Sequence, residues 1–177
     1  MAQQIDVAGK RVEYLDGEGR AAVAHYDQLV LATGSGLARV VEHAFDVDRI
    51  EEAVRLEEHL KALARSPSSA ARNTVVVAGG GFTGIETATE MPARLREVLG
   101  EDAQVRVIVV DRGQAIGASQ GAEIARSIAE ASAELGVEWC LNASVEVVDA
   151  EGVTLSDGQR IDAATVVWTC LLYTSDA

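Results

Sequence analysis

Residues 74–84 read TVVVAGGGFTG, an apolar and β-branched run that leads directly into a glycine-rich loop. The run predicts a strand that is buried on both faces of a sheet. The residues after the loop, to about Leu99, have the pattern of a helix. Gly79, Gly81 and Gly84 form the spacing G-x-G-x-x-G, which is a weak signal on its own. Its position between a strand and a helix is the context that a dinucleotide-binding loop requires.

The three glycines have separate physical roles in such a loop. Gly79 permits a tight turn, Gly81 lets the backbone approach a pyrophosphate, and Gly84 lets the helix pack close to the strand. The free N–H groups and the positive end of the helix dipole then face the phosphates. The alternative is a glycine turn that only joins a strand to a helix. We therefore predict that NAD(H) binds at Gly79, Gly80, Gly81, Phe82, Thr83 and Gly84.

The chain beyond this unit keeps alternating between strand and helix patterns. Such alternation with buried strands predicts an α/β fold, a three-layer Rossmann-like domain whose parallel sheet has right-handed crossovers. Residues 144–162 break the rhythm with short strands between turn clusters, which predicts a small antiparallel β-meander. The expected elements are strands at 105–110, 137–141 and 165–169 and a helix at 121–135 that ends at Gly136 as a C-terminal cap.

Asp111 directly follows the second strand of this unit. An acid at that position can accept hydrogen bonds from ribose hydroxyls. It lies 27 positions after Gly84, beyond the usual separation of about 20, and a long helix with the loop at 100–102 can absorb the excess. A carboxylate there repels a 2′-phosphate and favours NAD over NADP, although the adjacent Arg112 weakens that preference. The alternative is a solvated Asp at a strand end.

Two further residues belong to the helix after the loop. Glu86 would lie in its first turn, where an acid stabilises the helix dipole. Pro92 lies within the helical stretch, where it removes a backbone hydrogen bond and kinks or breaks the axis, and we interpret it as structural.

The N-terminal part predicts short strands near residues 5–7, 12–14 and 22–25. Residues 29–32 form a continuous apolar run, as in a strand buried on both faces. Residues 48–64 predict an acidic amphipathic helix with Asp46 or Asp48 as its cap. Its predicted apolar face consists of Ile50, Ala53, Val54, Leu60 and Leu63, with Leu56 near the same face. Residues 66–69, SPSS, read as a linker and are the best candidate for a domain boundary.

Composition excludes several classes of function. The 177 residues carry a formal net charge of −13, which argues against a nucleic-acid partner and against a polybasic membrane patch. No apolar run approaches 20 residues, and the first residues do not resemble a signal peptide. Two cysteines without short spacing give neither a disulfide framework nor a zinc site, so we expect a reducing, cytoplasmic location.

The remaining chemistry-bearing residues receive structural interpretations. The histidines have no metal-ligand spacing, and we expect them to be solvated or locally bonded. Cys140 and both tryptophans lie on strands, where core packing is the expected role. The sequence therefore predicts no metal site and no catalytic side chain; the residues set aside are His25, His43, His59, Cys140, Trp139 and Trp168.

Three pieces of sequence together resemble one family. They are residues 26–35, YDQLVLATGS; residues 75–86, VVVAGGGFTGIE; and residues 162–169, DAATVVWT. Their order resembles the flavin-dependent pyridine-nucleotide oxidoreductases, and most closely the type II NADH dehydrogenase group, which passes electrons from NADH through FAD to a quinone. The resemblance spans nearly all of residues 5–169.

The resemblance implies an NAD domain inserted into an FAD domain. Residues 1–35 would be a partial FAD-domain meander and closing strand, 36–72 a connecting segment, 73–163 the NAD(H) domain, and 164–169 the return strand. Thr33 and Gly34 would lie close to the flavin, and Glu86 would approach the nicotinamide. The full-length protein would hold FAD, use a quinone or another small acceptor, and could form a homodimer.

The sequence also departs from the family. The family's own FAD-binding glycine loop does not precede Ile5, and its second FAD motif and C-terminal segment do not follow Thr169. Residues 170–177, CLLYTSDA, resemble a translated transposase end sequence used in preparing sequencing libraries, and we exclude them from the fold as an artefact. We expect a fragment that turns over no substrate and binds NAD(H) at most weakly.

Two alternatives stay open. The first is a reductase of the same superfamily for ferredoxin, a disulfide or another small acceptor. The second is a stand-alone NAD-binding module that senses redox state. For the full-length dehydrogenase, a missing C-terminal segment could bring the protein to the cytoplasmic face of the membrane as a peripheral protein.

Overall fold

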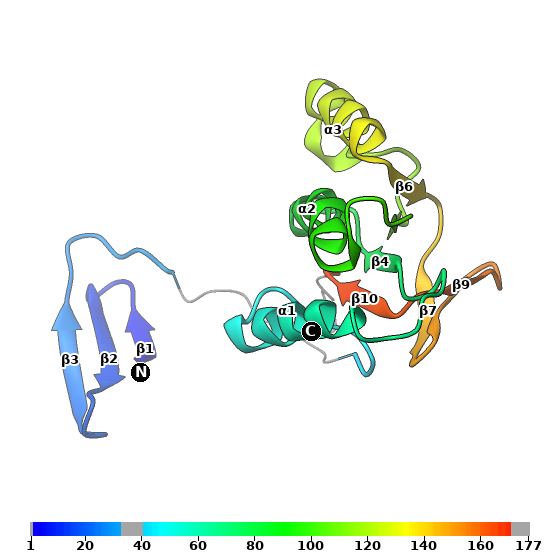
Figure 1. Cartoon of the computed structure of the whole chain (residues 1–177). Coiled ribbons are helices and arrows are strands. Elements are labelled where there is room, and N and C mark those ends of the chain that lie inside the picture. The colour runs from blue at the N-terminus through cyan, green and yellow to red at the C-terminus, as the bar shows by residue number, and fades with distance from the viewer. Residues whose placement is uncertain (1, 33–40, 171–177) are drawn as a thin grey trace. The chain divides into compact units, whose positions relative to one another are not determined.

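The computed structural model describes residues 2–32 and 41–170, and these fall into two compact units, Met1–Ser35 and Gly36–Ala177 (Figure 1). The predicted adaptor-like tail falls almost entirely on residues 171–177, outside the described residues, as do Thr33 and Gly34.

The first unit is a three-stranded antiparallel meander in the order β1-β2-β3. The three short strands predicted there are confirmed as β1 (Ala2–Asp6), β2 (Arg11–Leu15) and β3 (Ala21–His25). The prediction of a buried strand at residues 29–32 is wrong. That segment is not a strand, and Val30 is 84% exposed. A strand buried on both faces needs partners for its backbone N–H and C=O groups, and none of the described strands pairs with it.

The second unit is built on a parallel sheet of four strands, as predicted. Its order is β10-β4-β5-β6, and every neighbouring pair is parallel. The chain runs from β4 to β5 and then β6 on one side, and returns to pair β10 with the other side of β4. The strands are β4 (Thr74–Ala78), β5 (Arg106–Val110), β6 (Val137–Cys140) and β10 (Thr165–Trp168).

Helices cover one face of this sheet and a meander covers the other (Figure 1). Because β4 is buried on both faces, alternate residues serve two cores: Val75 and Val77 face the helices, and Val76 faces the meander. The covering elements are α1 (Ile50–Leu63), α2 (Phe82–Leu99), α3 (Ala122–Leu135) with a 3-10 turn at Ala118–Gln120, and the antiparallel strands β7 (Val145–Asp149), β8 (Gly152–Leu155) and β9 (Arg160–Asp162).

Glycine and proline act in the helices as the sequence indicates. Gly136 caps α3 with a left-handed φ of 74°, and its N–H donates to the carbonyls of Ala133 and Ser132. Pro92 is buried within α2, which continues through it to Leu99. The structure therefore rules out a helix break at Pro92.

The amphipathic helix at 50–63 exists, but its details differ from the prediction. Leu56, Leu60 and Leu63 are buried, whereas Ile50 and Val54 are 76% and 49% exposed. The N-cap is Arg49 and no side chain caps the helix. Asp46 instead accepts a hydrogen bond from the Arg49 N–H and pairs with the Arg49 guanidinium at 2.6 Å.

Residues 66–69 do not separate two compact units. The leucines of α1 pack in the same core as β4 and α2, on both sides of this segment. Arg72 also fixes the segment, because its side chain donates to the Ser66 carbonyl and the Ser68 hydroxyl. A proline with serines is compositionally typical of a linker, but here hydrogen bonds from Arg72 hold the segment in place.

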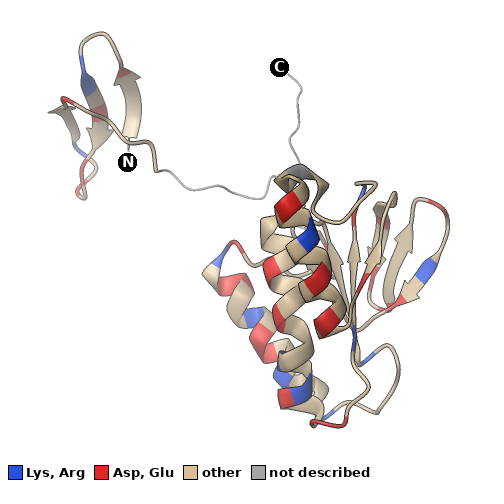
Figure 2. Cartoon of the chain, turned by 90° about the horizontal axis from the view of Figure 1, so that it is seen from above, with Lys and Arg blue, Asp and Glu red and all other residues tan. Residues whose placement is uncertain are grey.

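Helix α1 carries four Glu but only one Arg and one Lys, so it presents no basic cluster. Figure 2 shows acidic residues in red interspersed with basic ones in blue along the helices. Among the residues that the structure describes, no helix is long and apolar enough to cross a bilayer.

Candidate functional site

The glycine loop lies at the place where the strand order of the parallel sheet reverses. It follows β4, which has β5 on one side and β10 on the other. In open α/β sheets, ligands bind outside the carboxyl ends of the strands at this reversal. The topology therefore puts the predicted loop where the fold has its natural binding crevice.

The buried glycines of the loop, Gly79, Gly80 and Gly84, are required by packing. Gly79 has a φ of +111°, a conformation that side chains disfavour, and its N–H donates to the Val110 carbonyl at 2.9 Å. A Cβ at Gly84 would collide with the carbonyl oxygen of Gly79. A Cβ at Gly80 would lie 2.9 Å from carbons of both Asp111 and Trp139. These contacts confirm the tight turn and the close helix–strand packing expected from the sequence.

The open edge of the loop, Gly81, Phe82 and Thr83, has a different environment. A Cβ at Gly81 would meet no atom within 4 Å, and the Phe82 side chain is 60% exposed. Gly81 is the N-cap of α2, and it has no side chain that could cap the first N–H groups of the helix. The first N–H groups of a helix lack intrahelical acceptors, so they are available to an anion here. The residues present thus fit a pyrophosphate.

Asp111 contacts the loop directly, which the sequence did not indicate. Its Oδ2 accepts a hydrogen bond from the Gly80 N–H at 2.7 Å, and its Oδ1 accepts one from Gly113 at 2.7 Å. Each carboxylate oxygen has a second lone pair, so acceptance from a ribose hydroxyl is compatible with both bonds. The arrangement gives the carboxylate a role in holding the loop, in addition to the predicted role toward ribose.

A cavity of about 200 Å³ adjoins the loop and the ends of β5 and β10. Asp111 and Arg112 are both among the residues that line it. Trp168 also lines it and is only half-buried, so the prediction of a core role for that side chain is wrong in part. Cys170 lies there too, and burial raises the pKa of its thiol.

Glu86 lies farther along the helix than expected. Since α2 begins at Phe82, Glu86 is its fifth residue, beyond the first turn, and its side chain is exposed. The prediction of a first-turn acid that stabilises the helix dipole is therefore wrong. The loop residues and Asp111 are brought together, whereas Thr33 and Gly34 lie outside the described residues.

Two residues at opposite ends of β10 have contacts that the sequence interpretation missed. The hydroxyl of Thr169 donates to the Ala78 carbonyl at 2.9 Å, next to the loop. At the other end, the Thr165 hydroxyl oxygen is hydrogen-bonded to Nε2 of His59, at 3.0 Å. Burial lowers the pKa of His59. His59 was expected to be solvated or locally bonded, but its partner is 106 positions away. Such contacts depend on the sheet order, which no local pattern contains.

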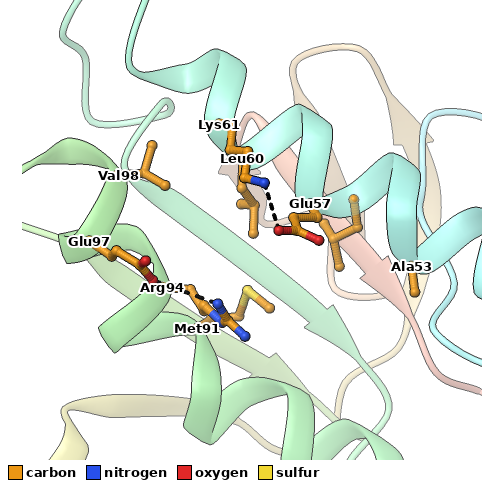
Figure 3. A pocket seen from close by; sticks show the side chains of 9 residues that line it. Ala53, Glu57, Leu60, Lys61, Met91, Arg94, Glu97 and Val98 are labelled. Atoms are coloured by element: carbon orange, nitrogen blue, oxygen red, sulfur yellow. Dashed lines mark ion pairs between the residues drawn. The ribbon is translucent and has the colours of Figure 1, made fainter.

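A second hollow, of about 350 Å³, lies between α1 and α2 (Figure 3). Its floor includes Leu60 and Met91. Ion pairs flank it, Glu57 with Lys61 at 2.7 Å and Arg94 with Glu97 at 3.6 Å. These charges are already paired with one another.

Within residues 2–32 and 41–170, no group of three His, Cys, Asp or Glu side chains is arranged to hold a metal ion.

Comparison with known proteins gives consistent matches. A family profile described as pyridine nucleotide-disulphide oxidoreductase matches residues 1–170. An NADH dehydrogenase-like protein of Mycobacterium tuberculosis is 43% identical over 171 residues, covering 93% of this chain and 42% of that protein. The type II NADH:quinone oxidoreductase of the same species is 30% identical over 189 residues, covering 93% of this chain and 40% of that protein.

Among solved structures, NDH2 from Plasmodium falciparum in complex with NADH superposes with a TM-score of 0.68 at 16% identity, covering 96% of this chain and 39% of that one. A ferredoxin reductase from Rhodopseudomonas palustris superposes with a TM-score of 0.64 at 23% identity, covering 95% and 39%. At these identities the likeness shows the fold alone. The chain spans about two fifths of the length of the curated relatives it matches.

Proposed function

The chain belongs to the pyridine nucleotide-disulphide oxidoreductase family, and on this basis we propose that it binds NAD(H) at the glycine loop between β4 and α2. The observation that carries the proposal is the open edge of the loop. Among the described residues, no atom lies within 4 Å of a Cβ built at Gly81, and no side-chain hydrogen bond caps the N-terminus of α2. A diphosphate supplies the negative charge and acceptor oxygens that uncapped N–H groups bind.

Each predicted site residue has a part in this proposal. The N–H groups of Gly81, Phe82 and Thr83 hold the pyrophosphate. Asp111 accepts from ribose hydroxyls while it holds Gly80 in place. Glu86, exposed on α2, approaches the nicotinamide end, as the family resemblance implies.

For the whole protein we propose a flavin-dependent NADH dehydrogenase. When bound, FAD would supply the chemistry that accepts the hydride of NADH, and a quinone is the proposed acceptor of the electrons. The names of the two mycobacterial relatives support this proposal. The unit Met1–Ser35 is then assigned to the FAD domain, with Thr33 and Gly34 near the flavin, and residues 73–163 form the NAD(H) domain. A peripheral membrane location and a homodimer would be properties of the full-length protein.

A reductase that uses Cys140 and Cys170 as its cysteine pair is a less favoured candidate. Both cysteines are free, and burial raises the pKa of the Cys140 thiol as well as that of Cys170. A raised pKa keeps these thiols protonated near neutral pH, whereas the thiolate is the reactive form in disulfide exchange.

Fluorescence titration of the 177-residue chain with NADH and NADPH tests the proposal. We expect weak, saturable NADH binding, weaker NADPH binding, competition by ADP-ribose but not by adenosine, and no turnover of NADH. Competition by adenosine as strong as that by ADP-ribose would contradict a site built for the pyrophosphate, as would the absence of NADH binding. Tight NADH binding by this chain alone would instead favour a redox-sensing module.

A further inference from the structure

The Gly79–Gly80 peptide unit lies between two side chains that come from neighbouring strand ends. On its N–H side, Gly80 donates to Asp111, which follows β5. On its carbonyl side, the Gly79 oxygen lies 3.2 Å from the hydroxyl of Thr169, which follows β10. Because a peptide unit is planar, contacts at its N–H and at its C=O together define the orientation of the plane.

Thr169 reaches the loop through more than one contact. Its backbone N–H donates to the Ala78 carbonyl at 2.9 Å and continues the ladder between β10 and β4. Its hydroxyl donates to the same carbonyl at 2.9 Å, with the Gly79 carbonyl as a second acceptor. Cβ atoms built at Gly79 and at Gly84 would each lie 2.8 Å from this hydroxyl oxygen. The hydroxyl therefore occupies the space that these two glycines leave free.

A run of three glycines needs such external contacts. Glycine has access to both positive and negative φ, so a rotation of the peptide between Gly79 and Gly80 meets little local resistance. Such a rotation would move the Gly80 N–H away from Asp111 and change the direction of the chain that enters α2. The ligand-facing N–H groups follow immediately at Gly81, Phe82 and Thr83.

We propose that Thr169 is a positioning residue for the glycine loop: its hydroxyl holds the carbonyls of Ala78 and Gly79, so that the open edge stays aligned for a pyrophosphate. The inference rests on the proposed function in naming the ligand. The competing explanation is a threonine that only satisfies its own hydroxyl at the end of a strand and contributes to stability.

Three variants separate the two explanations. Thr169→Val keeps the shape of the side chain and removes the hydroxyl, and Thr169→Ser keeps the hydroxyl. Thr165→Val is the matched control, because it removes a buried hydroxyl from the same strand at the end that contacts His59. Thermal unfolding of all three reports any general loss of stability.

Hydrogen exchange on the 177-residue chain without ligand tests the positioning role itself. We expect peptides that cover residues 79–84 to exchange at least severalfold faster in Thr169→Val than in the wild type, and at the wild-type rate in Thr169→Ser and Thr165→Val. Unchanged exchange in Thr169→Val would overturn the inference, as would equal acceleration in Thr165→Val.

Titration with NADH and ADP-ribose then connects the hydroxyl to binding. We expect Thr169→Val to weaken both by about tenfold, in line with the loss of one well-placed hydrogen bond, and Thr169→Ser to restore them to within about twofold. Faster loop exchange with unchanged affinity would overturn the link to binding. If the wild type binds neither probe, the proposed function fails, and hydrogen exchange alone decides whether Thr169 positions the loop.

Discussion

The buried glycines and the open edge of the loop lie next to each other, yet different surroundings constrain them. Gly79, Gly80 and Gly84 are surrounded by protein atoms that a Cβ would strike, whereas Gly81 has none within 4 Å. The first group is therefore required by the fold, and Gly81 is free of any such requirement. Open space at Gly81, next to the first N–H groups of α2, leaves room for the proposed ligand, whereas the three buried glycines support the loop.

The largest effect is expected at Gly84. In a helix, alanine is favoured over glycine by about 1 kcal/mol. At Gly84, however, the added Cβ collides with the Gly79 carbonyl, which the hydroxyl of Thr169 contacts at 3.2 Å. We expect Gly84→Ala to lower the free energy of unfolding by about 2–3 kcal/mol net, as overpacking does. Urea unfolding measures it, and stability equal to or above that of the wild type would show that the collision is relieved by a small shift.

Gly81→Ala tests the other side of the comparison. The fold has room for this Cβ, but at an N-cap alanine is less favourable than glycine by roughly 0.5–1 kcal/mol. We expect a loss of stability of no more than about 1 kcal/mol, smaller than that of Gly84→Ala, with NADH affinity reduced about tenfold or more, which corresponds to about 1.4 kcal/mol. Urea unfolding measures the stability of Gly81→Ala, and NADH titration measures its affinity. Gly84→Ala, measured in the same two ways, is the comparison variant. Wild-type affinity in Gly81→Ala would mean that the open edge does not contact the ligand.

Asp111→Asn is expected to affect both properties moderately. An amide oxygen can replace only one carboxylate oxygen, so either Gly80 or Gly113 loses its acceptor. We expect a loss of about 1–2 kcal/mol in stability and weaker NADH binding, together with a smaller preference for NADH over NADPH. Asp102→Asn, at an exposed loop position, removes the same charge as a control. If both variants behave alike, net charge and not the hydrogen bonds explains the effect.

The smallest effect is a pH dependence that should leave the loop unchanged. Burial lowers the pKa of His59 in the folded chain, so below its ordinary value of about 6.5 the unfolded chain binds more protons. The stability that this group contributes is therefore lost as the pH falls from above to below that ordinary value. The melting temperature should depend less on pH in His59→Gln than in the wild type. In His25→Gln, which changes an exposed histidine of β3, its pH dependence should stay as in the wild type. A loss of NADH affinity in His59→Gln would show that the two ends of β10 are coupled.

Much of the second unit could be predicted because its signals are local. The strand, loop and helix around Gly79 follow from consecutive residues, and Gly136 ends α3 as a capping glycine does. Partners could not be predicted in the same way. The contacts of Asp111 with Gly80 and of Thr169 with Ala78 arise only once β5 and β10 flank β4.

The wrong predictions have the same origin. An apolar run at residues 29–32 predicts a buried strand only if neighbouring strands are present to receive it. Helical spacing places Ile50 and Val54 near the leucines of α1, but the direction from which α2 and the sheet approach decides which of them are buried. Glu86 was placed in a first turn because the pattern did not reveal that α2 begins already at Phe82.

The most direct test of the central claim is an NMR titration of the uniformly labelled chain with NADH, with the backbone amides as the readout. The account predicts that the largest chemical-shift changes occur at Gly81, Phe82 and Thr83, with smaller changes at Gly80 and Asp111. Changes centred on the hollow between α1 and α2, or spread evenly over the chain, would contradict a pyrophosphate site at the open edge of the glycine loop.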